Sequence, residues 1–222
     1  MPGYQTKNER VAIGDVESLH IRSLLDRQQF FDALGEAEAI GISDAAWPLF
    51  GLLWPSGRQL AVQMALRPVR ADERILEIGC GLGLASLVSH RRGADITASD
   101  CHPLAAGFLH ENARLNGLMP MAYQHSHWAT DVGPLRRFDL IIGSDVLYER
   151  DDGGVLAGFI ERNATAAAEV LIVDPDRANR SAFSKRMRGI GFELTECRLD
   201  DPLADGGAYK GRLLSYRRER AD

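Results

Sequence analysis

The chain has little of several features that define other protein classes. Its cysteines number three, Cys80, Cys101 and Cys197, and their spacing matches neither a zinc site nor a disulfide framework. No segment approaches the roughly 20 apolar residues of a membrane helix, and the N-terminal residues carry no apolar run behind a basic start. We therefore expect a soluble protein of the reducing cytoplasm, without a membrane contact or a metal site.

Positive charge is also in deficit. The 222 residues include 26 Lys and Arg against 31 Asp and Glu, which gives a net charge of -5. Such a chain has no general attraction to nucleic-acid phosphates, so we expect no nucleic-acid partner. With 45% hydrophobic residues, it is long enough for one well-filled core plus an N-terminal extension.

From about residue 70 onward, apolar runs alternate with amphipathic stretches. The pattern predicts strands at 74–78, 95–99, 121–125, 138–144 and 169–173, and helices at 82–92, 103–116, 153–165 and 179–189. Alternating strands and helices indicate parallel pairing with right-handed crossovers. Two late strands, 192–198 and 208–217, predict an antiparallel hairpin at one edge. The expected fold is α/β, a Rossmann-like doubly wound, mostly parallel seven-stranded sheet.

Residues 1–70 have a different character and predict an N-terminal extension. Apolar segments 11–13 and 19–21 flank Gly14-Asp15, a pattern typical of a hairpin. Segment 47–65 is dense in apolar and aromatic residues and contains a predicted helix at 57–66. We expect a hairpin and a Trp-rich helical lid over the edge or mouth of the sheet, forming one globular unit with the domain at 71–222.

The segment Glu77-Ile78-Gly79-Cys80-Gly81-Leu82-Gly83 stands where the first strand of the repeat turns into a helix. Ligands of open parallel sheets bind at this edge, where glycines let the backbone approach and a helix offers free N–H groups. A tight turn alone would also favour glycine. The dinucleotide fingerprint needs its third glycine one position later, at Leu84, which disfavours a nicotinamide-dependent oxidoreductase.

An acidic residue, Asp100, ends the second strand of the repeat, 23 positions after Glu77. Its carboxylate can accept both hydroxyl protons of an adenosine ribose. It can also cap the helix that begins near Pro103.

Over residues 70 to 175, these features resemble class I S-adenosylmethionine-dependent methyltransferases, whose first motif is an acidic residue followed by three alternating glycines. The resemblance implies S-adenosyl-L-methionine as the cofactor. It implies that the three glycines bound the methionine half, that Asp100 holds the ribose, and that Cys101 and His102 lie beside the adenine. The full predicted cofactor-binding set is Trp54, Glu77, Gly79, Cys80, Gly81, Gly83, Asp100, Cys101, His102, Trp128 and Ser144.

The predicted fourth strand ends in Gly143-Ser144-Asp145-Val146-Leu147-Tyr148, at the position that faces the methyl group in this class. The Asn/Asp-Pro-Pro-aromatic motif of enzymes that methylate bases or glutamine is missing here. Asp-x-x-Tyr instead resembles the seven-β-strand protein lysine methyltransferases of family 16, which implies Asp145 and Tyr148 as catalytic residues. Trp54-Pro55-Ser56-Gly57, Trp128 and Asp174-Pro175-Asp176-Arg177 add a similarity to the branch that acts on the electron-transfer flavoprotein β-subunit, although His127 stands where relatives often have an acidic residue.

A lysine acceptor must first lose a proton, because an ammonium has no lone pair. At pH 7 this costs about 4.6 kcal/mol. A carboxylate raises the pKa of a neighbouring amine, so we expect Asp145 to capture and orient the amine while Tyr148 and Trp54 desolvate it. Asp145 could instead cap a helix, Tyr148 could pack in the core, and Arg177 and Arg180 could contact an acidic partner or water.

The leading hypothesis is an N-methyltransferase that acts on lysine side chains of a protein partner. One alternative keeps the chemistry but methylates a small amine or nitrogen heterocycle. Two others differ in class: a nicotinamide-dependent oxidoreductase and a non-catalytic module that binds the cofactor.

Overall fold

The computed structural model describes residues 3–129, 137–148, 153–203 and 205–219. Its strands are β1 (Thr6–Ile13), β2 (Val16–Leu24), β3 (Arg74–Ile78), β4 (Asp95–Asp100), β5 (Ala122–His125), β6 (Phe138–Ser144), β7 (Ala164–Asp174), β8 (Glu193–Leu199) and β9 (Gly211–Arg218). Its helices are α1 (Glu36–Ala39), a 3-10 turn (Trp47–Gly51), α2 (Pro55–Leu66), α3 (Leu84–Arg91), α4 (Ala105–Leu115), α5 (Val155–Asn163) and α6 (Arg180–Gly189). None of the helices in these ranges has the length and apolar character needed to cross a membrane.

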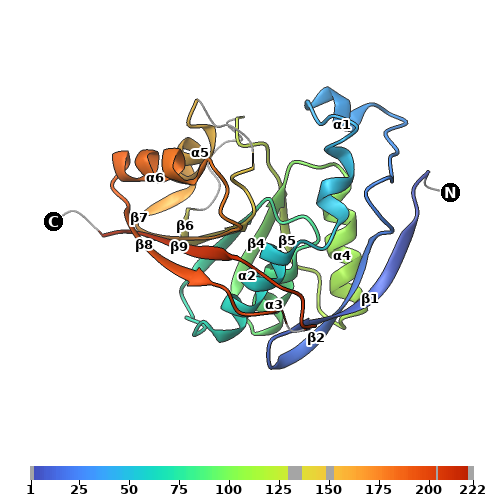
Figure 1. Cartoon of the computed structure of the whole chain (residues 1–222), viewed down its shortest axis with the longest axis horizontal. Coiled ribbons are helices and arrows are strands. Elements are labelled where there is room, and N and C mark those ends of the chain that lie inside the picture. Colours follow the sequence, from blue (N-terminus) through green and yellow to red (C-terminus); the bar gives the residue numbers. More distant parts are fainter. Residues whose placement is uncertain (1–2, 130–136, 149–152, 204, 220–222) are drawn as a thin grey trace.

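A seven-stranded sheet organises the molecule (Figure 1). Its strand order is β5-β4-β3-β6-β7-β9-β8, and β3 to β7 pair in parallel. β9 runs antiparallel to both β7 and β8. Because the chain leaves β3 toward β4 and later returns to β6 on the other side, the strand order reverses between β3 and β6. The predicted doubly wound fold with an antiparallel edge hairpin is confirmed.

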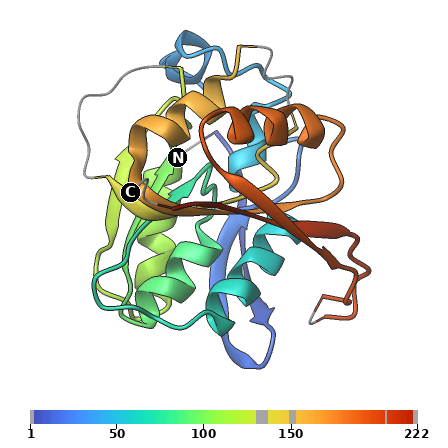
Figure 2. The same cartoon turned by 90° about the vertical axis from the view of Figure 1, so that its left-hand side faces the viewer.

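Helices cover both faces of this sheet (Figure 2). α5 and α6 lie on one face, and α2, α3 and α4 lie on the other. Strand residues alternate between the two hydrophobic clusters: Leu140 and Ile142 join the one beneath α2 to α4, and Ile141 joins the one beneath α5 and α6. A strand buried on both faces is apolar at nearly every position, which explains the strong apolar signal of β6.

The N-terminal hairpin β1–β2 packs beside α4 rather than over the sheet. The side-chain oxygen of Asn112 accepts the Arg22 N–H at 2.8 Å, and that of Asn116 accepts the His20 N–H at 2.9 Å. Hairpin residues belong to the same buried cluster as residues of α3 and α4. α2, which the sequence assigned to a lid, packs mainly against α3 and the sheet. Among the described residues of the extension, those that line the cavity at the carboxyl ends of the strands fall within 40–57, which includes the first turn of α2.

Candidate active site

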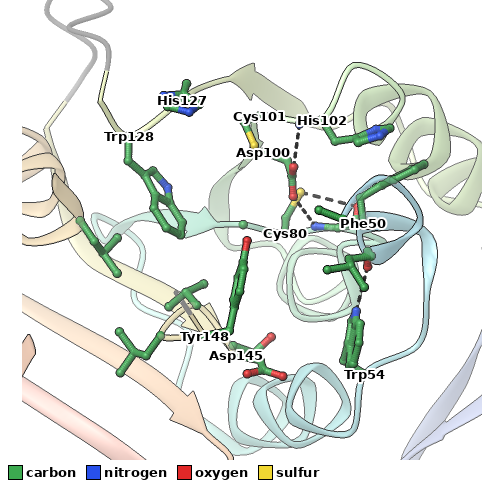
Figure 3. Close-up of a pocket in the computed structure, with 18 of the residues that line it drawn as sticks. Phe50, Trp54, Cys80, Asp100, Cys101, His102, His127, Trp128, Asp145 and Tyr148 are labelled. Atoms are coloured by element: carbon green, nitrogen blue, oxygen red, sulfur yellow. Dashed lines mark hydrogen bonds between the residues drawn. The ribbon is translucent and has the colours of Figure 1, made fainter. Parts of the chain in front are cut away.

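A cavity of about 850 Å³ lies at the carboxyl ends of β3, β4 and β6, beside the reversal of strand order. This volume lies within the range of small-molecule and cofactor sites, and the location is the one that open α/β sheets use. The predicted site residues that line it are Trp54, Glu77, Gly79, Cys80, Gly81, Asp100, Cys101, His102, Trp128, Ser144, Asp145 and Tyr148. Figure 3 shows Asp100, Cys101 and His102 toward one end and Asp145 and Tyr148 toward the other.

The glycine-rich turn after β3 has a backbone that side chains would disturb. Gly79 and Gly81 have φ values of 58° and 53°, in the left-handed region that favours glycine. A Cβ at Gly81 would lie 2.8 Å from the carbonyl oxygen of Phe50. Gly83 differs from the prediction because it lies outside the cavity lining, and a Cβ there would collide with Leu109 of α4. In this structure Gly83 leaves room for the Leu109 side chain beside the start of α3.

Glu77 joins the end of β3 to the start of α3. Its Oε2 accepts the Ser86 backbone N–H at 2.8 Å and also accepts the Ser86 hydroxyl. The carboxyl is 3% exposed, and burial raises its pKa to about 7. These contacts join β3 to the first turn of α3 and so hold the glycine-rich turn between them in place.

Asp100 joins that turn to the loop after β4. Its Oδ2 accepts the Gly81 N–H at 2.8 Å and its Oδ1 accepts the His102 N–H at 2.9 Å. Burial raises the pKa of Asp100, whereas these backbone donors favour its charged form. The predicted helix-capping alternative is not observed, since Leu104 occupies the N-cap of α4 and no side chain caps it. Each carboxylate oxygen keeps further lone pairs for a ligand.

Two buried polar atoms beside Asp100 have no hydrogen-bond partner within the described ranges: Nε2 of His102 and Oγ of Ser126. Both residues line the cavity. His102 stacks on Phe50 with ring centroids 3.7 Å apart, and burial lowers its pKa to about 4, so it is neutral at pH 7. The sequence reading missed Ser126 and Phe50. Ser126 follows β5 directly, at the same sheet edge as Asp100, and that position is the signal that could have identified it.

An ion pair occupies the other end of the cavity. Arg177 Nε donates to Asp145 Oδ1 at 2.8 Å, and Arg177 Nη2 donates to Asp145 Oδ2 at 2.9 Å. Arg177 was predicted to contact an acidic partner or water, and the structure pairs it inside the molecule instead. The Asp145 side chain is 13% exposed and that of Arg177 is 41% exposed, so the pair lies at the cavity rim.

Two alternatives from the sequence are wrong at this end. Asp145 does not cap the following helix, because Gly154 is the N-cap of α5. Tyr148 does not pack in the core, since 51% of its surface is exposed and its side chain lines the cavity. The indole of Trp128 points into the same cavity (Figure 3). Trp54 is held at the rim, where its Nε1–H donates to the Leu49 carbonyl at 2.8 Å.

Solved structures similar to this chain include methyltransferases. A magnesium protoporphyrin IX methyltransferase from Synechocystis, with bound S-adenosylmethionine, superposes with a TM-score of 0.56 at 15% identity, covering 73% of this chain and 78% of that one. A ribosomal-protein methylase from Lactobacillus delbrueckii subsp. bulgaricus gives 0.58 at 19% identity, covering 76% and 81%. The fold is therefore that of the S-adenosylmethionine-dependent methyltransferases.

A family model described as lysine methyltransferase matches residues 51–189. The chain belongs to this family, and S-adenosyl-L-methionine is its cofactor. An electron transfer flavoprotein β-subunit lysine methyltransferase from Mus musculus is 28% identical over 208 residues, covering 91% of this chain and 78% of the relative. The Xenopus laevis enzyme of that name is 29% identical over 139 residues, covering 61% and 55%. A calmodulin-lysine N-methyltransferase from Arabidopsis thaliana is 29% identical, covering 64% and 52%. The chain thus spans about half the length of two of these relatives.

Proposed function

We propose that this chain transfers methyl groups from S-adenosylmethionine to lysine side chains of a protein partner. The observation that carries the proposal is one cavity with a carboxylate at each end, Asp100 beside the glycine-rich turn and Asp145 after β6. Relatives named for lysines of the electron transfer flavoprotein β-subunit and of calmodulin support a protein acceptor.

The chain's own residues suit the cofactor. The Asp100 carboxylate can accept ribose hydroxyls, because its backbone donors leave lone pairs unused. The unpartnered atoms of His102 and Ser126 offer hydrogen bonds to the edge of an adenine. Gly79 and Gly81 line the cavity with a left-handed backbone that side chains would disturb, and we assign the methionine portion to them. The lining predicted from the sequence, without Gly83, is our proposed cofactor site.

Bound S-adenosylmethionine supplies an electrophilic methyl group on its sulfonium. Asp145 would attract and orient the acceptor ammonium, which places its nitrogen without lowering the cost of deprotonation. The aromatic rings of Tyr148, Trp128 and Trp54 would displace water from the amine, and desolvation favours its neutral form. Most of the rate gain would then come from alignment.

An open rim favours a protein over a small amine as the acceptor. Tyr148 and Arg177, which border the acceptor end, are exposed to 51% and 41%. A side chain that remains attached to a folded partner needs such access. The three cysteines are free thiols, as in reducing compartments, and this supports activity in the cytoplasm.

The test is to incubate the purified chain with methyl-labelled S-adenosylmethionine and a lysate of its source organism. We expect a discrete labelled protein that yields methylated lysine on hydrolysis. Asp145→Asn should reduce labelling at least about 100-fold and leave cofactor affinity, measured by calorimetry, within a few fold. Asparagine is the suitable replacement because Asp145 has a φ of 52°, which Asn tolerates. Full labelling by this variant, or label in small molecules alone, would refute the proposal.

A further inference from the structure

The ion pair between Asp145 and Arg177 occupies the place where the proposed function puts the acceptor. Both carboxylate oxygens of Asp145 receive guanidinium N–H bonds, at 2.8 and 2.9 Å. A two-point pair of this kind is stronger and more directional than a single contact. An incoming ammonium therefore meets a carboxylate that already has a cation.

The turn that carries Arg177 is held firmly. Asp174 ends β7 with no exposed surface, and its Oδ1 accepts the Arg177 backbone N–H at 2.8 Å. Asp176 has a φ of 61°, and its carboxylate pairs with arginines from three different elements. Those arginines are Arg180, Arg198 and Arg212. The backbone of Arg177 is thus anchored, whereas 41% of its side chain is exposed at the rim.

Resting on the proposed function, we propose that Arg177 is a specificity-determining residue that holds the place of the acceptor cation and must be displaced from Asp145 by it. Because Arg177 must be displaced, the apparent affinity for any amine is its affinity for unpaired Asp145 multiplied by the fraction of time that Asp145 is unpaired. A small amine has only its own charge and alkyl chain to offset this. A protein acceptor gains additional binding energy from surfaces remote from the lysine.

The pair therefore selects protein-attached amines over free ones. The displaced guanidinium moves toward solvent at the rim, and its backbone stays fixed by Asp174. Among the described residues, the charge of Asp145 acts on Asp174 and Tyr209, and Tyr148 lines the same cavity; none of these three is a cation. The other described arginine of the lining, Arg186, lies on α6 beside Gly154.

The test uses n-butylammonium as a free mimic of the lysine side chain. Its affinity for the full chain, saturated with S-adenosylhomocysteine, is measured at pH 7 by saturation-transfer NMR. We expect Arg177→Gln to bind it about fivefold more tightly than the wild type, and Arg177→Lys to bind it with an intermediate affinity, because lysine keeps a cation but loses the two-point geometry of the guanidinium. Arg188→Gln on α6 is the matched control, since this exposed arginine lies outside the cavity lining and should change nothing.

The second readout is the ratio of label entering n-butylamine to label entering lysate protein. Arg177→Gln should raise this ratio several fold, and thermal melting should confirm that it folds. Arg177→Met provides a second uncharged variant if it does not. Equal n-butylammonium affinity in the wild type and both uncharged variants would overturn the inference, as would binding by Arg177→Lys at least as tight as that of Arg177→Gln. If Arg177→Gln binds the amine more tightly while the wild type labels no protein, the place-holding role stands and the proposed protein acceptor fails.

Discussion

The Phe50 ring lies parallel to the His102 imidazole, with centroids 3.7 Å apart and planes inclined by 12°. Phe50 belongs to the N-terminal segment, and His102 follows β4 of the main sheet. The Phe50 carbonyl also lies against the Gly81 turn. A single residue of the extension thus contacts both loops that form the proposed cofactor site. The arrangement of these loops therefore depends on residues outside the strand and helix repeat.

Replacing Phe50 should weaken stability and cofactor binding together. Phe50→Ala removes a side chain that is 7% exposed, so we expect a loss of about 3 kcal/mol in the free energy of unfolding. Urea unfolding followed by circular dichroism and by tryptophan fluorescence should give coincident transitions, because extension and domain share one core. Phe31→Ala, at a ring that is 40% exposed, is the control and should cost under about 1 kcal/mol. Separate transitions for the two probes would show that residues 1–70 fold independently.

Acid should destabilise the protein through His102. Burial lowers the pKa of His102 in the folded protein to about 4 from its ordinary value of 6.5, so the unfolded chain takes up the proton first as the pH falls. The stability it contributes is complete above pH 6.5 and is lost as the pH falls toward 4. Between pH 7 and 5 the loss should reach about 2 kcal/mol.

The effect of Glu77 has the opposite sign. Burial raises its pKa to about 7, so its contribution to the stability of the folded state increases as the pH falls from 7 toward 4.5. The informative quantity is therefore the difference between wild type and His102→Gln. Between pH 7 and pH 5, the change in the free energy of unfolding, measured by urea unfolding at each pH, should be about 2 kcal/mol more favourable to the folded state in the variant than in the wild type. The same pH dependence in both proteins would contradict the assignment to His102.

The glycine-rich turn should tolerate no side chain at Gly81. Gly81→Ala places a Cβ 2.8 Å from a backbone oxygen at a φ of 53°, so we expect at least a tenfold loss of S-adenosylmethionine affinity along with lower stability. Gly93→Ala is the matched control, since its φ is 81° but no atom lies within 4 Å of the added Cβ. The control should cost about 1 kcal/mol of backbone strain and leave affinity unchanged. Equal affinities for both variants would show that the cofactor does not use this turn.

Asp100 should determine the affinity for the cofactor rather than the rate of methyl transfer. Asp100→Ala removes the proposed ribose acceptor and frees the Gly81 and His102 N–H groups, so calorimetry should show at least a tenfold weaker S-adenosylmethionine complex. Asp95→Ala, at the exposed start of the same strand, serves as the control. A normal dissociation constant for Asp100→Ala would remove Asp100 from the site.

Predictions from the sequence succeeded for elements whose local residue pattern follows directly from their place in the fold. β6 is buried on both faces, so its apolar run identifies it, and the acidic residues at the ends of β3 and β4 fall at the expected sheet edge. They failed at Ala164 and Thr165, which were placed at the end of the helix predicted at 153–165, and they left 166–168 outside any element. In the structure β7 begins at Ala164, which pairs with Phe138 of β6.

The pairing of Asp145 with Arg177 could not be predicted from the local sequence pattern, for a different reason. The two residues are 32 positions apart and leave neighbouring parallel strands. Their approach also depends on a left-handed Asp176, whose carboxylate pairs with the nearby Arg180 and with two arginines remote in sequence, Arg198 and Arg212. Neither spacing nor residue type encodes a contact of this kind.

The placement of β9 between β7 and β8 determines when this protein can finish folding during synthesis. β7 pairs with β9 from Ala168 to Asp174, and β8 has β9 as its neighbour in the sheet. Until residues 211–218 have left the ribosome, β7 has an open apolar edge, and such edges are sites of misassociation for nascent chains. The proposed active site can therefore take shape early, on β3, β4 and β6, while the sheet that supports it closes only with the last strand.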